Sequence, residues 1–255
     1  MKLFFQHYGE GFPLLILHGL LGASGNWHSM SRNVFGPAYS TYAIDQRNHG
    51  RSPHVDAMSY PLMAEDIARF MDDQELERAH LLGHSMGGKV AMTFALTYPD
   101  RVERLVVADI APRAYPPHHT TIFDALSRLD VNALGSRAAI DEALAADIPS
   151  WPVRQFLLKN LAAESGGGFT WKMNLDALIR NYDALSAAVP ESGIFTGSAL
   201  FIRGGASDYV RDADEQDIYR LFPSAELLTV PGAGHWVHAE APEAFGEAVM
   251  AFLAR

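Results

Sequence analysis

The sequence predicts an α/β protein with a mainly parallel sheet, helices on its faces and a helical insertion. Short apolar runs alternate with segments of helical spacing, which is typical of a parallel sheet covered by helices. The alternation stops between about Pro112 and Pro190, where only helical pieces are expected. A chain of 255 residues is long enough for one large core with an inserted subdomain.

Six strands are expected, the first of them buried, and each is followed within two residues by a glycine, aspartate or proline, which favour turns. These strands are Leu14–Leu17, Thr41–Ile44, His80–Leu82, Leu105–Ala108, Leu200–Ile202 and Leu227–Val230. Apolar residues at helical spacing predict core helices over 59–75, 90–98 and Glu243–Leu253. The pattern therefore places the core in 1–111 and 191–255.

The remaining segment, 112–190, is interpreted as a helical cap inserted between two core strands. No strand is expected in it. Its helical pieces lie near Ile122–Leu129, Arg137–Ala146, Val153–Leu161 and Leu175–Leu185, with Gly166–Gly168 interrupting them.

Composition narrows the class of protein. The formal net charge of −10 argues against binding to nucleic acid or to anionic membranes. The absence of cysteine excludes a disulfide scaffold and a cysteine nucleophile. The first ten residues lack an apolar run of signal-peptide length, and no segment reaches the roughly 18 apolar residues of a membrane span. We therefore expect a cytoplasmic enzyme without membrane association.

The segment Gly83–Gly87 (GHSMG), followed by Gly88, predicts that Ser85 is a nucleophile. Gly-x-Ser-x-Gly between a strand and a helix forms a strained turn that exposes the serine Oγ above the sheet. Both flanks are present here, because an apolar run precedes the motif and helical spacing follows it. A merely structural turn is the alternative.

The segment His18–Gly22 (HGLLG), at the end of the first buried strand, predicts part of an oxyanion hole. Such a hole needs two backbone N–H donors that converge on one oxygen. In this kind of site they come from the residue after the nucleophile and from a His-Gly loop. The amides of Met86 and Leu20 are therefore the candidates, and an ordinary glycine turn is the alternative.

The general base is expected in a loop after a late strand, where the chain carries His235 and His238. His235 is preferred because Gly234 permits a tight loop that presents the imidazole. The acid that orients this histidine is either Asp109 or Asp208, since each follows a core strand and fits the order Ser, Asp, His. The residues alone leave these two carboxylates open.

Five blocks of the chain resemble the YbfF-type bacterial esterases, which are small α/β-hydrolases with a helical cap. The blocks are His18–Gly22, Asp45–Ser52, Gly83–Lys89, Asp109–Pro112 and Gly232–His238. The resemblance implies activity on short acyl esters, with acyl-CoA thioester cleavage also attributed to the family. It also implies that Asp109 is the acid, because Ser207 takes the place that the acid has elsewhere in the fold and Asp208 is offset by one residue.

These residues predict an esterase that transfers an acyl group to Ser85 and then to water. We expect no metal or organic cofactor; the adjacent His118 and His119 are a poor metal site, and Asp45 with Arg47 is interpreted as a structural ion pair or turn network. A small acyl ester or thioester is the expected partner. Alternatives are an acyl-CoA thioesterase, a carbon–carbon bond hydrolase and a slow-turnover ligand receptor. The cap aromatics expected to set the pocket size are Tyr115, Phe123, Trp151, Phe156 and Trp171.

Overall fold

The computed structural model describes all 255 residues and contains a seven-stranded sheet in the order β1-β3-β2-β4-β5-β8-β9. The strands are β1 (Phe5–Tyr8), β2 (Phe12–Leu17), β3 (Tyr39–Ile44), β4 (Ala79–His84), β5 (Val102–Ala108), β8 (Ser198–Gly204) and β9 (Ala225–Val230). All neighbours pair in parallel except β1, which pairs antiparallel with β3. The predicted α/β class is confirmed, and β1 was not predicted because it is a short, half-buried edge strand.

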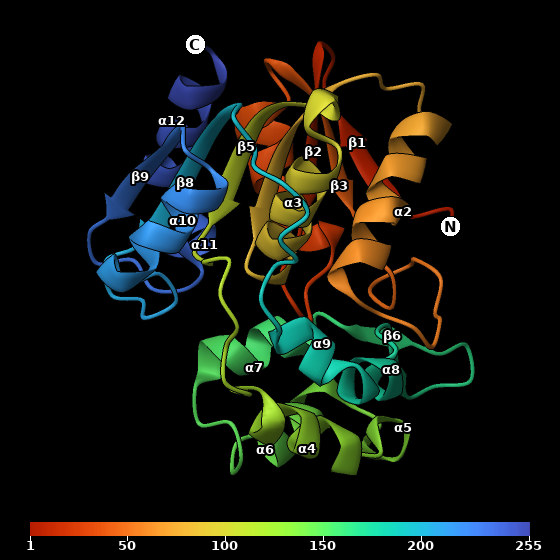
Figure 1. Ribbon diagram of the computed structural model, residues 1–255. Helices are drawn as coiled ribbons and strands as arrows, with labels where there is room; N and C mark the ends of the chain where they lie inside the picture. Colours follow the sequence, from red (N-terminus) through yellow and green to blue (C-terminus); the bar gives the residue numbers. More distant parts are fainter.

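Helices cover both faces of the sheet because its strands are apolar on both sides. On one face, Leu15 and Leu17 pack in the same cluster as Phe70 and Phe94. On the other face, Leu14 and its neighbours pack with residues from the C-terminal helix. Figure 1 shows α2 and α3 in front of the sheet. The core helices are α1 (His28–Met30), α2 (Tyr60–Asp73), α3 (Met86–Thr97), α10 (Glu215–Leu221), α11 (Val237–Glu240) and α12 (Pro242–Leu253).

The strand register brings several loops to one edge of the sheet. Leu17 at the end of β2 pairs with Gly83, and Gly83 pairs with Val107 near the end of β5. Ala108 in turn pairs with Ile202 of β8. Since the carboxyl ends of neighbouring parallel strands meet at one edge, the loops after β2, β4, β5 and β8 lie together there.

Six short helices form a separate layer beside this edge, drawn in green and teal in the lower half of Figure 1. They are α4 (Thr120–Arg128), α5 (Val131–Leu134), α6 (Arg137–Leu144), α7 (Trp151–Leu158), α8 (Leu175–Arg180) and α9 (Tyr182–Ser186). We propose that 112–190 is a cap and that 1–111 with 191–255 is the core, and this arrangement supports both boundaries.

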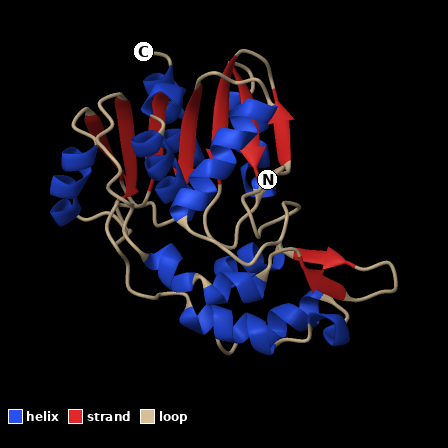
Figure 2. Cartoon of the chain, turned by 45° about the vertical axis from the view of Figure 1, so that its right-hand side comes forward, coloured by secondary structure: helices blue, strands red, loops and turns tan.

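The expectation that the cap contains no strand is wrong. Strands β6 (Leu161–Ala163) and β7 (Phe169–Trp171) pair antiparallel and form the small hairpin that Figure 2 shows apart from the main sheet. Gly167 and Gly168, with φ of 89° and 84°, provide the left-handed backbone of its turn. The hairpin escapes prediction because three-residue strands are too short to show alternation.

Candidate active site

Ser85 lies at a sharp turn between β4 and α3. Its φ of 53° and ψ of −119° are strained for a residue with a Cβ. A Cβ on Gly83 would lie 2.2 Å from the carbonyl oxygen of Gly87, and a Cβ on Gly87 would lie 2.2 Å from that of Leu17. The two glycines of the motif are therefore required by the crossing of strand and helix, not by the chemistry of the serine.

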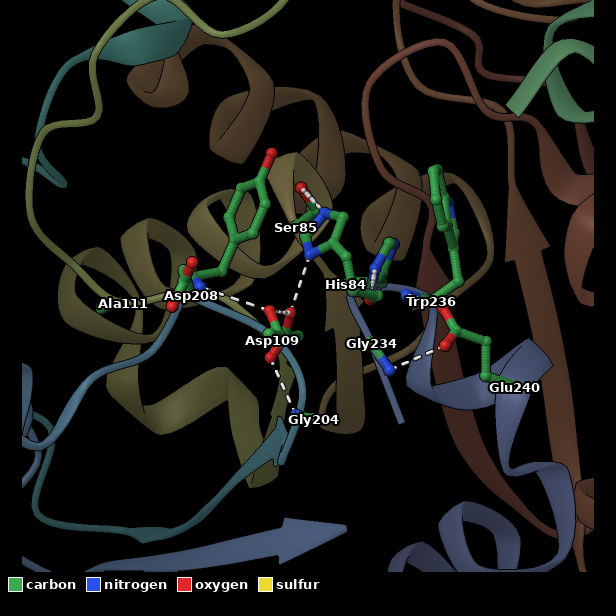
Figure 3. A network of polar contacts seen from close by, with 12 residues as sticks. His84, Ser85, Asp109, Ala111, Gly204, Asp208, Gly234, Trp236 and Glu240 are labelled. Atoms are coloured by element: carbon green, nitrogen blue, oxygen red, sulfur yellow. Dashed lines mark hydrogen bonds and ion pairs between the residues drawn. The ribbon is translucent and has the colours of Figure 1, made fainter. Parts of the chain in front are cut away.

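Three predicted residues meet at the carboxyl edge of the sheet. The Oγ of Ser85 lies 3.0 Å from Nε2 of His235, and Nδ1 of His235 lies 2.8 Å from Oδ2 of Asp109 (Figure 3). Because Nδ1–H donates to the carboxylate, Nε2 carries the lone pair that accepts from the serine hydroxyl. The geometry is that of a nucleophile, a base and an orienting acid.

The Asp109 carboxylate is fully buried and has three donors. Besides His235, the Gly204 amide donates to Oδ1 at 2.9 Å and the Ser207 hydroxyl donates to Oδ2 at 2.5 Å. These bonds compensate for the loss of hydration. Asp109, which directly follows β5, has a φ of 49°, so its backbone is strained as that of Ser85 is.

Asp208, the other candidate acid, does not contact His235. It is exposed, and its main-chain carbonyl accepts from Nε of Arg211 at 3.2 Å. Its neighbour Ser207 instead points to the buried carboxylate of Asp109. Ser207, at the position where the acid lies elsewhere in the fold, thus donates to Asp109, the aspartate that follows β5.

Three residues that the sequence did not identify as site residues hold His235. The carboxylate of Glu240 accepts from the amides on both sides of it, from Gly234 at 2.7 Å and from Trp236 at 3.2 Å (Figure 3). Nε2 of His84 donates to the main-chain oxygen of His235 at 2.8 Å, and the ring of Tyr209 stacks on its imidazole at 3.7 Å. His84 belongs to the Gly83–Gly87 motif, which could have indicated it. No motif marks Glu240 or Tyr209.

His238 is buried and lines the same cavity as Ser85, but its ring stacks on Trp27 with centroids 4.2 Å apart and makes no hydrogen bond to the serine. Burial lowers its pKa to about 3, and the neighbouring His235 and Lys159 contribute to the decrease. It therefore stays neutral at physiological pH. The geometry favours His235 over His238 as the base.

The amides proposed for the oxyanion hole border the space in front of Ser85. Met86 is the first residue of α3, so its N–H has no partner within the helix. In the loop after β2, the Gly22 amide donates to Gly19 O at 3.0 Å and the Leu21 amide donates to Nε2 of His49 at 3.2 Å. Leu20, which precedes both of these residues, lines the cavity beside the serine.

The loop 45–52 braces this oxyanion loop. The Gln46 amide donates to Nε2 of His18 at 3.0 Å, and Asp45 accepts from the Ser24 amide at 2.6 Å. The expected ion pair between Asp45 and Arg47 is wrong, because Nε of Arg47 pairs with Asp66 of α2 at 2.6 Å. Asp45 instead ties backbone amides on both sides of the loop, which is the turn network that the sequence also allowed.

Two cavities meet at Ser85. The larger, of about 280 Å³, is lined by His235 and by apolar cap residues that include Phe156 and Leu157. The smaller, of about 40 Å³, is lined by Met86, Lys89 and Tyr115, among others. Leu20, Ser85, His118, His119 and Tyr209 border both cavities.

The expectation that five cap aromatics line the pocket is correct only for Phe156 and Tyr115. Trp151 is 61% exposed, and Phe123 is buried inside the cap. His118 and His119 border the cavities instead, and the structure contains no group of three His, Cys, Asp or Glu side chains that could hold a metal ion.

Comparisons with known proteins agree with this architecture. Residues 13–161 match the family model for the alpha/beta hydrolase fold. The chain is 39% identical to the mouse (Mus musculus) protein named sn-1-specific diacylglycerol lipase ABHD11, over 94% of this chain and 80% of that one. It is 33% identical to the Escherichia coli protein named Esterase YbfF, over 97% and 95% of the two chains. A solved structure described as a marine microorganism esterase is 42% identical, with a TM-score of 0.95 and coverage of 98% and 99%.

The fold and these matches define an α/β-hydrolase. Within that class, the chain belongs to the YbfF-type esterase family, and it is a carboxylic ester hydrolase.

Proposed function

We propose that the protein is a serine esterase that hydrolyses short-chain acyl esters through an acyl-enzyme on Ser85. The observation that carries this proposal is the hydrogen-bonded chain from Ser85 through His235 to the buried Asp109. A serine hydroxyl is a weak nucleophile until a base accepts its proton, and the base needs the correct tautomer. The Asp109 bond to Nδ1 supplies that tautomer.

In the first half of the reaction, Nε2 of His235 takes the Ser85 proton as Oγ attacks the ester carbonyl. The oxygen of the tetrahedral intermediate becomes negative and is held by the Leu20 and Met86 amides. The same Nε2 then protonates the leaving alcohol, which departs and leaves an acyl ester on Ser85. Asp109 stabilises the imidazolium that exists between the two proton transfers.

In the second half, water replaces the alcohol, and His235 removes a proton from it during attack on the acyl-enzyme. Collapse of the second tetrahedral intermediate returns the proton to Ser85 Oγ and releases the acid. Nε2 of His235 accepts and returns the proton in every step. The scheme therefore uses no metal and no organic cofactor.

The limited volume beside Ser85 supports a preference for short acyl groups, since cavities of about 280 and 40 Å³ lie under the cap. The test is a series of p-nitrophenyl esters from acetyl to palmitoyl, with acyl-CoA thioesters assayed in parallel. We expect kcat/KM to be highest for short acyl chains and to fall for long ones. A steady rise towards palmitoyl would overturn the short-chain preference, and faster cleavage of the thioesters would make the enzyme a thioesterase.

The location of the enzyme rests on the sequence. No helix in the protein combines the length and the apolar character that a membrane crossing requires. A cytoplasmic location stays a prediction, which fractionation of cells that express the protein tests.

A further inference from the structure

The small cavity beside Ser85 contains a buried cation without a counter-ion. The Lys89 side chain lies on α3 and the residue is 1% exposed, yet no carboxylate lies within ion-pair distance of its Nζ. Lysine is rarely buried to this extent unless it is paired. The motif Gly83–Lys89 places it four residues after Ser85, on the same side of the helix.

The contacts of Lys89 satisfy only part of its capacity. Nζ donates to the Ala187 main-chain oxygen at 2.5 Å and lies 4.7 Å from the ring centre of Tyr115 and 5.4 Å from that of Tyr60. An ammonium group has three donors, so two remain for a ligand. Arg113 lies over the same Tyr115 ring at 3.9 Å, and unlike Lys89 it is paired with a carboxylate, that of Asp214 at 2.8 Å.

The two cavities differ in their relation to His235, and this difference assigns the two halves of the ester. In the proposed reaction, Nε2 of His235 protonates the leaving alcohol, so the alcohol lies beside His235. His235 lines the larger cavity and not the smaller one. The acyl group is then directed to the smaller cavity, between Met86 of the oxyanion hole and Lys89.

We propose that the smaller cavity is the acyl subsite and that Lys89 binds a carboxylate at the far end of the acyl group. The preferred substrates are then mono-esters of short dicarboxylic acids. This inference rests on the proposed function, because it uses the roles of Ser85 and His235. Ser85, Met86 and Lys89 border the same small cavity, so a short acyl chain that starts at Ser85 extends towards Lys89.

Kinetics with matched esters test the inference. We expect wild type to hydrolyse monomethyl succinate with a higher kcat/KM than dimethyl succinate, followed in a pH-stat at pH 6.5. In Lys89→Met the ratio of the two values should fall about tenfold to a hundredfold, the range for a lost hydrogen bond between charged groups. Lys2→Met is the matched control, because it removes the same charge from an exposed site and should keep the wild-type ratio.

A wild-type ratio that favours dimethyl succinate, or a ratio that Lys89→Met does not change, would show that Lys89 only holds the cap through Ala187. Hydrolysis of methyl butyrate distinguishes this result from failure of the proposed function. If wild type hydrolyses methyl butyrate but does not prefer monomethyl succinate, only the acyl subsite is wrong. If it hydrolyses none of these esters, the proposed function fails as well.

Product inhibition of wild type provides a test that needs no variant. Succinate and butyrate each offer one carboxylate to the reaction centre, but only succinate has a second one for Lys89. We expect succinate to inhibit hydrolysis of p-nitrophenyl acetate at least about tenfold more strongly than butyrate. Equal inhibition constants would overturn the proposal.

The pH dependence of this inhibition identifies the cation. Burial lowers the pKa of Lys89 to about 7, with a contribution from the Arg113 charge. The ammonium form is present below that pKa, so succinate should bind best at pH 6 and less well as the pH rises. A bound carboxylate raises the pKa, which shifts the midpoint above 7.

Other titratable groups also face this cavity. Burial raises the pKa values of Tyr60 from α2 and of Tyr115 from the segment between β5 and α4, so neither ionises in this range. Burial lowers the pKa of His119 to about 4. Tyr182, Tyr209 and His118 complete the titratable lining. Lys89→Met should abolish the difference in pH dependence between succinate and butyrate, whichever of these groups also titrates.

Discussion

The core side and the cap side of the site are built differently. On the core side, hydrogen bonds hold the loops: the Glu240 carboxylate accepts from both flanks of His235, and the Ser207 hydroxyl and the Gly204 amide donate to Asp109. On the cap side, apolar side chains such as Phe156 border the larger cavity without a polar contact to the reacting residues. Preorganised polar groups at the reacting atoms set reaction rates. The shape of a mostly apolar pocket, with the few polar groups in it, sets which substrates fit.

This contrast teaches where each kind of variant should act. Changes to the core-side groups that hold Ser85, His235 and Asp109 should lower kcat, because these groups stabilise the charge that develops in the transition state. Lys89, also on a core helix, borders the acyl subsite and should act on substrate ranking instead. Changes on the cap side should alter KM and the ranking of substrates. The predictions below test that division.

The largest effect is expected for Ser85→Ala. Because Oγ is the proposed nucleophile, kcat with p-nitrophenyl acetate should fall by about 10⁴ to 10⁶. The melting temperature should change little, since the strained turn remains. Activity within tenfold of wild type, with contamination excluded, would show that Ser85 is not the nucleophile.

Asp109→Asn should come next, with a loss of about 10⁴ in kcat, because an amide at this position leaves the imidazole of His235 in the wrong tautomer. Asp208→Asn is the matched control, and we expect less than a threefold change, because this exposed carboxylate does not reach His235. The reverse result would assign the acid to Asp208, and comparable losses would mean that both carboxylates serve His235.

Glu240→Gln should have an intermediate effect. One amide NH₂ group would face a backbone N–H at either Gly234 or Trp236, so the His235 loop loses one of its two supports. We expect kcat to fall about tenfold while KM stays within twofold, as for a lost transition-state interaction. Glu243→Gln, at an exposed position of α12, is the control. A rise in KM at constant kcat would place Glu240 in substrate binding instead.

The smallest effect is expected on the cap side. Phe156→Ala should reduce the preference for phenyl acetate over methyl acetate about two- to fivefold, because a large leaving group loses apolar contact in the larger cavity. Trp151→Ala changes an aromatic residue of the same helix that is 61% exposed, and it should leave this ratio unchanged. A hundredfold fall in kcat for Phe156→Ala would contradict the expectation that cap-side changes act on KM and substrate ranking rather than on kcat.

The sequence predicted those parts of the site that have a local signature. Ser85 and His235 are found because glycines beside them are required by tight turns, and such turns are visible in the order of residues. The residues alone leave the choice between Asp109 and Asp208 open. It depends on which of the two loops directs its carboxylate towards His235, and local sequence does not determine this. The structure brings Asp109 to His235 and turns Ser207, not Asp208, towards it.

Other parts left no local trace. Tyr209 reaches His235 from a distant part of the sequence. Glu240 lies only five residues after His235, but no motif marks it as the residue that holds the loop. The strands of the cap hairpin are too short for a period to appear, and β1 is only half-buried. Five aromatic cap residues were expected at the pocket, but helical spacing alone does not say which side of a short helix faces the core.

Covalent labelling tests the central claim most directly, because it reports which atom reacts. Wild-type protein treated with a fluorophosphonate should gain one phosphonyl group per chain by intact mass, and peptide mapping should place it on Ser85. Ser85→Ala should take up none, and Asp109→Asn should react far more slowly than Asp208→Asn. Labelling at another residue, or hydrolysis that continues after complete modification of Ser85, would contradict the proposed mechanism.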